Sequence, residues 1–529
     1  MTKTFPVFKK WVPGWLVSVL LFITIMPSMV LFFLPLANIN AAAGHYGGEP
    51  ADIQFAVALF YSGYAGFYAL ERRFFSYLAT KEYFIVFTVL QILLATGCYL
   101  TNEVFVLFPL RFIQGMLFAC MVNLSLSLMF TRLHSERARE VGYSVFFCLL
   151  LVAMPFNNLI TADSIDSFNF NLVYKWTVFS YLPCLVLLMI SMNNVRLNVR
   201  FPLYKLDWQS FVLLSVPLCL FGYVMIYGQE YYWLQDSRIS LSIIAGVLLL
   251  FLFFVRQRSS KRPYIHNGVF AGRNFNLSLL LLLILYICRF ASGITNAFFS
   301  LSLGFDPIHV SYINVCNIVG IVAGVTLSCC LIVQKKSVHL IWMSGFLLLL
   351  VFHFMMLFLF NPEANAGNFF VPLFLQGTGV GMLLVPIIIY TIASVSPVMA
   401  PSAAAVCLIA RYAGFAGSIG IMNYFELYGR SRHYNSFQDK LTLLDYSVHR
   451  KLAAGAGKLH ANGLLHTEAG RGSDKLLVKA VNAQTQLLFA MDYYEMMCWL
   501  LIATLLLFAF FPYLNRTMVY LKTRMLSPI

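Results

Sequence analysis

Fourteen apolar stretches, most of them about twenty residues long, recur along this 529-residue chain. An α-helix rises about 1.5 Å per residue, so about twenty apolar residues cross the hydrocarbon core of a bilayer. Transmembrane β-strands are about ten residues long and alternate between apolar and polar positions, and these stretches do neither. The sequence therefore predicts an all-α polytopic membrane protein. The expected spans are 13–38, 52–70, 83–101, 104–130, 141–161, 173–193, 209–228, 238–255, 275–297, 311–333, 338–360, 368–394, 402–426 and 491–514.

The distribution of positive charge predicts how these spans are threaded. Lys and Arg outnumber Asp and Glu by 15 over the whole chain. With the N-terminus inside, the inner loops and the two tails hold 22 Lys and Arg, whereas the short outer loops hold 2. Short loops rich in Lys and Arg stay in the cytoplasm. Both termini are therefore expected to be cytoplasmic. The same asymmetry accounts for the positive charge without a nucleic-acid partner.

A short internal repeat indicates how the spans are grouped. Arg111-Phe-Ile-Gln-Gly115 in the fourth span recurs as Leu373-Phe-Leu-Gln-Gly377 in the twelfth. Parallel repeats of this kind characterise one large transporter architecture. We expect two six-helix pseudo-repeats plus two inserted helices. The predicted domains are an N-terminal six-helix bundle (1–200), an inserted helix pair (201–262) and a C-terminal six-helix bundle (263–529).

Residues 427–490 form the predicted long loop between the last two spans. Helices are expected at 439–452 and 474–489, joined by the segment 455–472, which is rich in Gly, Ala and His. The loop histidines are separated by 16, 11 and 6 residues, so no pair lies one helical turn apart, and no Cys accompanies them. We therefore predict no metal site.

Three arginines, Arg111, Arg289 and Arg411, lie at depth within predicted spans. A guanidinium at the centre of a transmembrane helix costs about 2.5–3.5 kcal/mol on insertion scales, and such residues tend to be functional. No Asp or Glu lies at comparable depth, so the interior is net positive and would favour anionic or acidic solutes. The alternative is that each arginine pairs with a backbone carbonyl or an interfacial carboxylate. The sequence leaves both interpretations open.

Further polar and small residues complete the predicted site. Gln114 and Asn123 lie on the same helix as Arg111, and His353 is a titratable group in the eleventh span. Glycine faces allow close helix packing, and proline bends a span. The predicted packing or conformational residues are Gly115, Pro155, Gly377, Gly414 and Gly417.

Sequence signatures of enzymes are absent. The chain contains no Walker-type Gly-Lys-Ser/Thr, no His-Glu-x-x-His and no dinucleotide-binding fingerprint. We therefore expect neither catalysis nor a bound cofactor. Energy for any transport must come from a gradient or from a partner protein.

The chain resembles the fourteen-span drug:proton antiporter branch of the major facilitator superfamily. The resemblance is carried by the span count, by Arg111–Gly115, by Arg411-x-x-Gly414, and by the end of the long loop at 480–494. It implies a bacterial inner-membrane exporter that works by alternating access, with a role for Arg111 in proton coupling. It also implies a periplasmic loop 427–490, a periplasmic membrane-fusion adaptor and an outer-membrane channel as partners. Membrane lipid and a small-molecule substrate complete the expected partners.

Several family motifs are altered in this chain. Family members carry an acidic residue in the first span before a Leu-Pro, where this chain has Met26-Pro27 ahead of Leu34-Pro35. The glycine-rich pattern after the second span is missing, and the fifth-span motif survives only as Pro155. The main hypothesis is export of amphiphilic or anionic small molecules, which the long outer loop favours. Two alternatives stay open: an uptake permease for an anionic solute, and a non-transporting scaffold or sensor derived from a transporter.

Overall fold

The computed structural model describes residues 7–75, 78–132, 138–167, 170–195, 206–260, 262–442 and 445–510. Within them, 14 helical segments are long and apolar enough to cross a membrane, as the sequence predicts. The first six spans comprise α1 (Gly14–Phe33), η1 (Leu34–Asn38), α2 (Ile39–Tyr46), α3 (Pro50–Phe75), α4 (Thr80–Leu100), α5 (Val104–Arg132), α6 (Ala138–Ser167) and α7 (Leu172–Ser191). Next come α8 (Trp208–Tyr227), η3 (Trp233–Gln235) and α9 (Ser237–Ser259). The last six spans comprise η4 (Asn267–Ala271), α10 (Arg273–Phe290), α11 (Ser292–Leu301), α12 (Pro307–Val333), α13 (Val338–Leu359), η5 (Ala366–Phe369), α14 (Phe370–Ala393), α15 (Ala400–Lys440), α16 (Tyr446–Ala461) and α17 (His466–Phe510).

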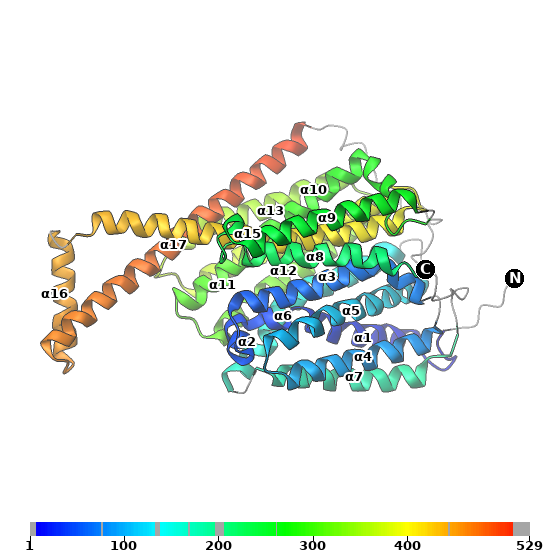
Figure 1. Cartoon of the computed structure of the whole chain (residues 1–529), viewed down its shortest axis with the longest axis horizontal. Helices are drawn as coiled ribbons and strands as arrows, with labels where there is room; N and C mark the ends of the chain where they lie inside the picture. The colour runs from blue at the N-terminus through cyan, green and yellow to red at the C-terminus, as the bar shows by residue number, and fades with distance from the viewer. Residues whose placement is uncertain are drawn as a thin grey trace.

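The helices run side by side in one elongated bundle, from which α15, α16 and α17 project at one end (Figure 1). We call that end of the bundle the arm side. We call the opposite end, where α1 and α15 begin, the terminal side. The two groups of six spans meet where α3 packs against α15 and where α6 packs against α12.

Two glycines allow α3 and α5 to approach each other closely. A Cβ atom added to Gly115 would lie 1.9 Å from the carbonyl oxygen of Phe60, and one added to Gly63 would lie 2.3 Å from that of Phe112. Both distances are far below van der Waals contact, so only glycine fits at these crossings.

The same pair of contacts recurs between α12 and α14. A Cβ atom added to Gly377 would lie 2.3 Å from the carbonyl oxygen of Asn317, and one added to Gly320 would lie 2.3 Å from that of Phe374. Gly377 and Phe374 occupy the positions in the repeated motif that Gly115 and Phe112 occupy in the first copy. The short repeat in the sequence therefore corresponds to one helix crossing that is built twice. The predicted domain boundaries at residues 200 and 262 stay a prediction.

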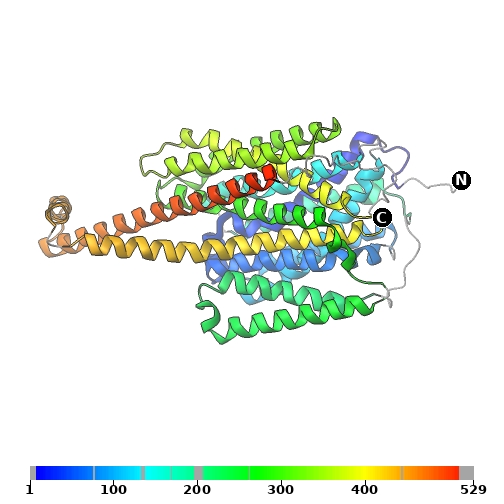
Figure 2. The same ribbon diagram turned by 90° about the horizontal axis from the view of Figure 1, so that it is seen from above.

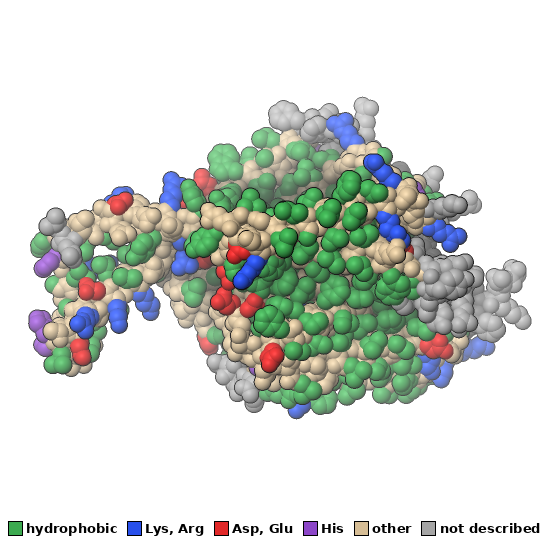
Figure 3. All heavy atoms as spheres, viewed as in Figure 1, with side chains coloured by type: hydrophobic (Ala, Val, Ile, Leu, Met, Phe, Trp, Pro, Cys, Tyr) green, Lys and Arg blue, Asp and Glu red, His purple; other side chains and the backbone are tan. Residues whose placement is uncertain are grey.

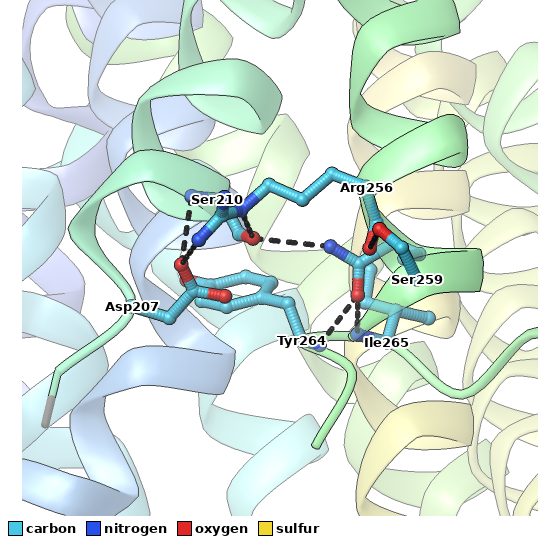
Figure 4. A network of polar contacts seen from close by, with 7 residues as sticks. Asp207, Ser210, Arg256, Ser259, Tyr264 and Ile265 are labelled. Atoms are coloured by element: carbon cyan, nitrogen blue, oxygen red, sulfur yellow. Dashed lines mark hydrogen bonds and ion pairs between the residues drawn. The ribbon is translucent and has the colours of Figure 1, made fainter. Parts of the chain in front are cut away.

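The inserted helices α8 and α9 are joined at their terminal-side ends by a polar network (Figure 4). Ser210 accepts hydrogen bonds from Arg256 Nε (3.0 Å) and Gln257 Nε2 (3.1 Å), while Arg256 Nη2 pairs with Asp207 Oδ1 at 2.9 Å. Burial tends to raise the pKa of Asp207, but hydrogen bonds from Ser210 and Arg256 outweigh it and lower that pKa below its ordinary value.

This network also fixes the segment that follows α9. The backbone N–H of Tyr264 donates to Gln257 Oε1 at 2.5 Å, and the Tyr264 hydroxyl donates to the carbonyl of Gly66 in α3 at 2.6 Å. Further along the pair, the Tyr412 hydroxyl of α15 donates to the carbonyl of Leu218 in α8 at 2.7 Å. Helix α8 therefore packs against both α3 and α15 and covers one of the two seams between the six-helix groups.

The arm corrects the expectation for residues 427–490. Helix α15 does not end near Glu426 but continues to Lys440, and α17 begins at His466, well before the expected span at 491–514. Residues 446–461 form α16, so much of the Gly-, Ala- and His-rich segment is helical. Figure 2 shows α15 and α17 extending together from the bundle to the arm tip, where α16 joins them. His433 Nε2 lies 2.8 Å from Asp492 Oδ2 and pairs the two long helices where they leave the bundle.

The outer surface fits a protein embedded in lipid. Hydrophobic side chains cover most of the visible face of the bundle, and Lys and Arg gather at the terminal side and along the arm (Figure 3). Large apolar side chains on α9 are more than half exposed, among them Leu241, Ile244, Val247 and Phe251. A soluble bundle would bury such residues, whereas a membrane protein turns them towards lipid.

Candidate substrate pathway

The first span is interrupted at Leu34-Pro35, and Arg111 caps the interruption. Proline has no N–H, so Pro35 cannot donate the helical hydrogen bond to the carbonyl of Leu31. Arg111 supplies the missing donor: Nη1 donates to the Leu31 carbonyl at 2.8 Å, and Nη2 donates to the Phe32 carbonyl at 2.7 Å. The guanidinium of α5 thereby holds the end of α1 in place.

The remaining contacts enclose Arg111 completely. Its Nη1 also donates to Gln114 Oε1 at 3.0 Å, and its guanidinium carbon lies 4.6 Å from the centre of the Phe60 ring. The side chain has no exposed surface. This geometry matches the alternative in which the arginine pairs with backbone carbonyls. A role for Arg111 and Gln114 in a substrate or proton pathway stays a prediction.

The ninth span is also interrupted, between α10 and α11. Helix α10 ends after 18 residues and α1 ends after 20 residues, so the two first spans of the six-helix groups break at similar depths. At the second break the Tyr494 hydroxyl donates to the carbonyl of Ala291 at 3.2 Å and bonds to the Thr295 hydroxyl. Interrupted spans at corresponding positions of two repeats point to the binding region of a transporter.

A cavity of about 50 Å³ lies next to this second break, towards the arm side. Arg289 lies at the edge of the cavity, and its Nη2 is 3.4 Å from the carbonyl of Leu151. The other polar lining residues are amides and hydroxyls: Asn158, Ser292, Thr295, Asn296, Asn314, Asn317 and Gln376. Pro155 and Gly377 also line the cavity, so three of the predicted site residues meet here.

A second cavity, of about 30 Å³, lies towards the terminal side. Arg411 of α15 is among its lining residues, with its guanidinium carbon 5.2 Å from the centre of the Phe147 ring. The other aromatic lining residues are Tyr64, Tyr68, Tyr143 and Phe146. The twelfth span lines both cavities, together with the ninth span in the arm-side cavity and the fourth span in the terminal-side cavity.

Tyr286 lies between the two arginines. Arg411 Nε donates to its hydroxyl at 2.8 Å, and the guanidinium carbon of Arg289 lies 6.0 Å from the centre of its ring. Gly414 makes room for this tyrosine, because a Cβ atom there would lie 2.7 Å from Tyr286 Cβ. The predicted residues Arg289, Arg411 and Gly414 therefore meet around a residue that the sequence analysis did not select.

Aromatic rings from four spans form a chain of contacts near Tyr286. The ring centre of Phe290 lies 5.0 Å from that of Phe415, which lies 5.6 Å from that of Tyr61. Tyr61 in turn lies 5.0 Å from Phe32, beside the break in the first span. We call these four residues and Tyr286 the aromatic partition, of which Tyr286 contacts both Arg289 of the arm-side cavity and Arg411 of the terminal-side cavity.

Like Arg111, Gln114, Gly115 and Gly414, three further predicted residues line neither cavity. Asn123 donates to Glu71 Oε2 at 2.6 Å, towards the far end of α5 from Arg111. His353 is fully buried in α13, with Nδ1 2.7 Å from the carbonyl of Leu349 and its ring beside Tyr494. Gly417 has open space where a Cβ atom would lie, so it is not required for packing.

The sequence analysis missed the polar residues that line the arm-side cavity. Asn296, Asn314 and Asn317 lie inside predicted apolar spans, and polar side chains within spans are a recognised signal of functional or packing sites. That signal was available from the sequence. The tyrosines of the partition carried no comparable signal, because the chain contains 28 tyrosines and most of them pack elsewhere.

The comparisons with known proteins are distant. No family model matches the chain. The colistin resistance protein EmrB of Acinetobacter baumannii is 22% identical over 222 residues, and the match covers 41% of this chain and 42% of that relative's length.

Solved structures match over nearly the whole chain. A POT family transporter in complex with a thioalcohol-conjugated peptide is 12% identical, with 94% of this chain and 96% of that chain covered and a TM-score of 0.60. The human organic anion transporter MFSD10 (TETRAN) is 12% identical, with coverages of 93% and 100% and a TM-score of 0.51. The chain has the major facilitator fold. The predicted resemblance to that superfamily is confirmed at the level of fold, with 14 candidate spans.

Proposed function

We propose that the protein is a secondary transporter that exports amphiphilic or anionic small molecules by alternating access. The observation that carries the proposal is a pair of separate cavities, each lined by an arginine that contacts Tyr286 of the aromatic partition. Each cavity reaches one buried arginine, and both lie between the two six-helix groups. Such an arrangement is expected of a closed intermediate whose two groups rock to open one cavity at a time.

The interruptions in the first and ninth spans support this mechanism. Breaks near Pro35 and Ala291 leave carbonyls that Arg111 and Tyr494 satisfy with side-chain hydrogen bonds. Side-chain bonds of this kind can be exchanged as helices move, whereas continuous helical bonds resist bending. The major facilitator fold and the absence of enzyme signatures support transport rather than catalysis.

Two kinds of observation support export and assembly with an adaptor and an outer-membrane channel: the arm, and two relatives. One distant relative is described as a colistin resistance protein, and one structural relative is described as an organic anion transporter. We place the protein in a bacterial inner membrane with both termini in the cytoplasm, so that the arm formed by α15, α16 and α17 reaches into the periplasm. The arm is where a membrane-fusion adaptor leading to an outer-membrane channel would dock.

Proton coupling is part of the proposal. Glu71 and His353 are buried titratable groups, each within a candidate span. Tyr83 donates to Glu71 Oε1 at 2.5 Å and Asn123 donates to Oε2, so a change of protonation at Glu71 would alter contacts of α3 with both α4 and α5. Neither group replaces the acidic residue that the family carries in the first span.

Flux in proteoliposomes tests the proposal. The full chain is reconstituted with a pH gradient of either sign, and movement of 1-naphthoate and 1-naphthamide is followed in each direction, with protein-free liposomes as the control. We expect gradient-dependent flux out of the side that corresponds to the cytoplasm. Accumulation in the opposite direction would identify an uptake permease, and absence of protein-dependent flux of either compound would refute transport of this substrate class.

A further inference from the structure

We infer that Arg289 and Arg411 form a two-part site for the single anionic group of an aromatic organic acid, with Tyr286 as the bridge between the parts. The inference rests on the proposed transport function and specifies its substrate class. Arg411 holds the anion when the terminal-side cavity is open, and Arg289 holds it when the arm-side cavity is open.

The hydrogen bonds of the three buried arginines separate structural from binding roles. A guanidinium has five N–H donors. Arg111 makes three hydrogen bonds, two of them to the carbonyls of the interrupted first span. Arg289 makes one long hydrogen bond, and Arg411 makes one, through Nε. Both of the latter line a cavity, so their remaining donors are available to a ligand there.

The charge of this pair is not balanced within the described part of the chain. The ion pairs found there are Arg256 with Asp207, Arg430 with Glu426 and His433 with Asp492. Arg289 and Arg411 are 8% and 4% exposed and pack on aromatic rings. Buried charges are ordinarily paired or neutralised. An anion entering from either side supplies the missing partner.

The linings indicate the rest of the ligand. The arm-side cavity offers amide groups around Arg289, including Asn158, Asn296 and Asn314, which suit the oxygens of a carboxylate or sulfonate. The terminal-side cavity offers the rings of Tyr64, Tyr143 and Phe147, among others, which suit an aromatic body. Cavities of about 50 and 30 Å³ accept an anionic headgroup in the closed state, and the body requires one side to open.

Tyr286 gives the anion a continuous path. Its hydroxyl accepts from Arg411, and Arg289 lies three residues further along α10 with its guanidinium beside the same ring. An anion that leaves Arg411 therefore reaches Arg289 by crossing a single side chain. The aromatic partition can rearrange while the anion stays bound to one of the two guanidinium groups.

The test compares three ligands that share a naphthalene ring and differ in the charge of their polar group. Full-length protein in a non-ionic detergent is titrated with 1-naphthoate, 1-naphthamide and 1-naphthylmethylammonium, and affinity is derived from thermal stabilisation. We expect naphthoate to bind at least about tenfold more tightly than the other two, because a charged hydrogen bond is worth about tenfold or more. Arg289→Gln and Arg411→Gln should each reduce naphthoate affinity by about tenfold and leave naphthamide unchanged.

Arg238→Gln is the matched control. Arg238 lies at the start of α9 beside Tyr231, outside both cavities, so its loss removes one positive charge without touching the site. Equal affinity for the three ligands, no stabilisation by any of them, or an equal effect of Arg238→Gln would overturn the inference. If Arg289→Gln or Arg411→Gln does not fold, the relative affinities of the unmodified protein for the three ligands decide whether the inference stands. Specific naphthoate binding without flux in proteoliposomes would refute transport alone, whereas equal flux of naphthoate and naphthamide would refute the anion site alone.

Discussion

Arg411 donates a hydrogen bond of 2.8 Å from Nε to the hydroxyl of Tyr286, across the contact between α15 and α10. Both residues are buried, and the bond joins two helices that belong to the same six-helix group. It fixes the orientation of the guanidinium towards the terminal-side cavity. The packing of Tyr286 in α10 therefore determines the direction in which the positive charge of Arg411 faces a substrate.

Tyr286→Phe should impair transport while leaving the ring in place. The variant keeps the aromatic contacts with both arginines and removes the oxygen that orients Arg411. A hydrogen bond to a charged group contributes about 1.5–3 kcal/mol, so we expect naphthoate flux to fall by about tenfold. Proteoliposome flux measures the effect, and Tyr434→Phe in the arm is the control. Unchanged flux would show that Tyr286 acts only as packing.

Arg111→Gln should lower stability more than it lowers substrate affinity. The substitution leaves the carbonyls of Leu31 and Phe32 without their donors, and an unsatisfied buried polar group costs about 1–3 kcal/mol. Thermal unfolding in detergent measures the first effect, and the naphthoate titration measures the second. Loss of flux with unchanged stability would instead favour the coupling role that the family resemblance implies.

Gly115→Ala should be poorly tolerated, whereas Gly417→Ala should be nearly neutral. The added methyl group would lie 1.9 Å from the Phe60 carbonyl in the first case and meets nothing within 4 Å in the second. Overpacking typically costs about 1–3 kcal/mol. The folded yield and the unfolding temperature should both be lower for Gly115→Ala than for Gly417→Ala, and equal values for the two variants would contradict the prediction. Since Gly377 makes the equivalent contact in the second six-helix group, Gly377→Ala should behave like Gly115→Ala.

The free energy of unfolding should fall as the pH rises through the pKa of Glu230. Glu230 is exposed, but partial desolvation by its surroundings, followed by the neighbouring carboxyl of Glu49, raises its pKa above the ordinary value of 4.5. The folded state thus binds the proton more tightly than the unfolded state, so this stabilisation is fully present below pH 4.5 and is lost as the pH rises through the raised pKa. Unfolding temperatures measured from acid to neutral pH should show this loss.

Glu230→Gln should remove that dependence, because the amide does not titrate. The matched control is Glu363→Gln, which changes an exposed carboxyl on the loop between α13 and η5. A pH dependence that survives in Glu230→Gln would assign the effect to another group.

The spans could be predicted from the sequence because the bilayer imposes length and apolarity on each of them separately. The helix crossing at Gly115 was also visible, since its motif recurs at Gly377. The arm was misjudged because hydropathy reports only the part of a helix that lies in lipid. Helix α15 continues through polar residues such as Arg430 to Lys440, where apolarity no longer marks its course.

The roles of the arginines could not be derived from the sequence. Arg111 contacts Leu31 and Phe32, which lie 80 and 79 residues away, and only the folded chain shows that these carbonyls need a donor. Similarly, the packing of α15 against α10 brings Arg411 to Tyr286, which lies three residues from Arg289 on the same helix. The charge of each residue was predictable, whereas its partner was a property of the tertiary structure.

Helix α15 carries Arg411 within the bundle and continues without interruption to Lys440 at the arm. At about 1.5 Å per residue, the distance along the helix between those two residues is about 44 Å. If α15 tilted by about 10° about Arg411, Lys440 would move by about 8 Å over that length. The position of the arm would therefore depend on the tilt of α15. A protein bound to the arm would respond to which cavity is open without contacting the substrate.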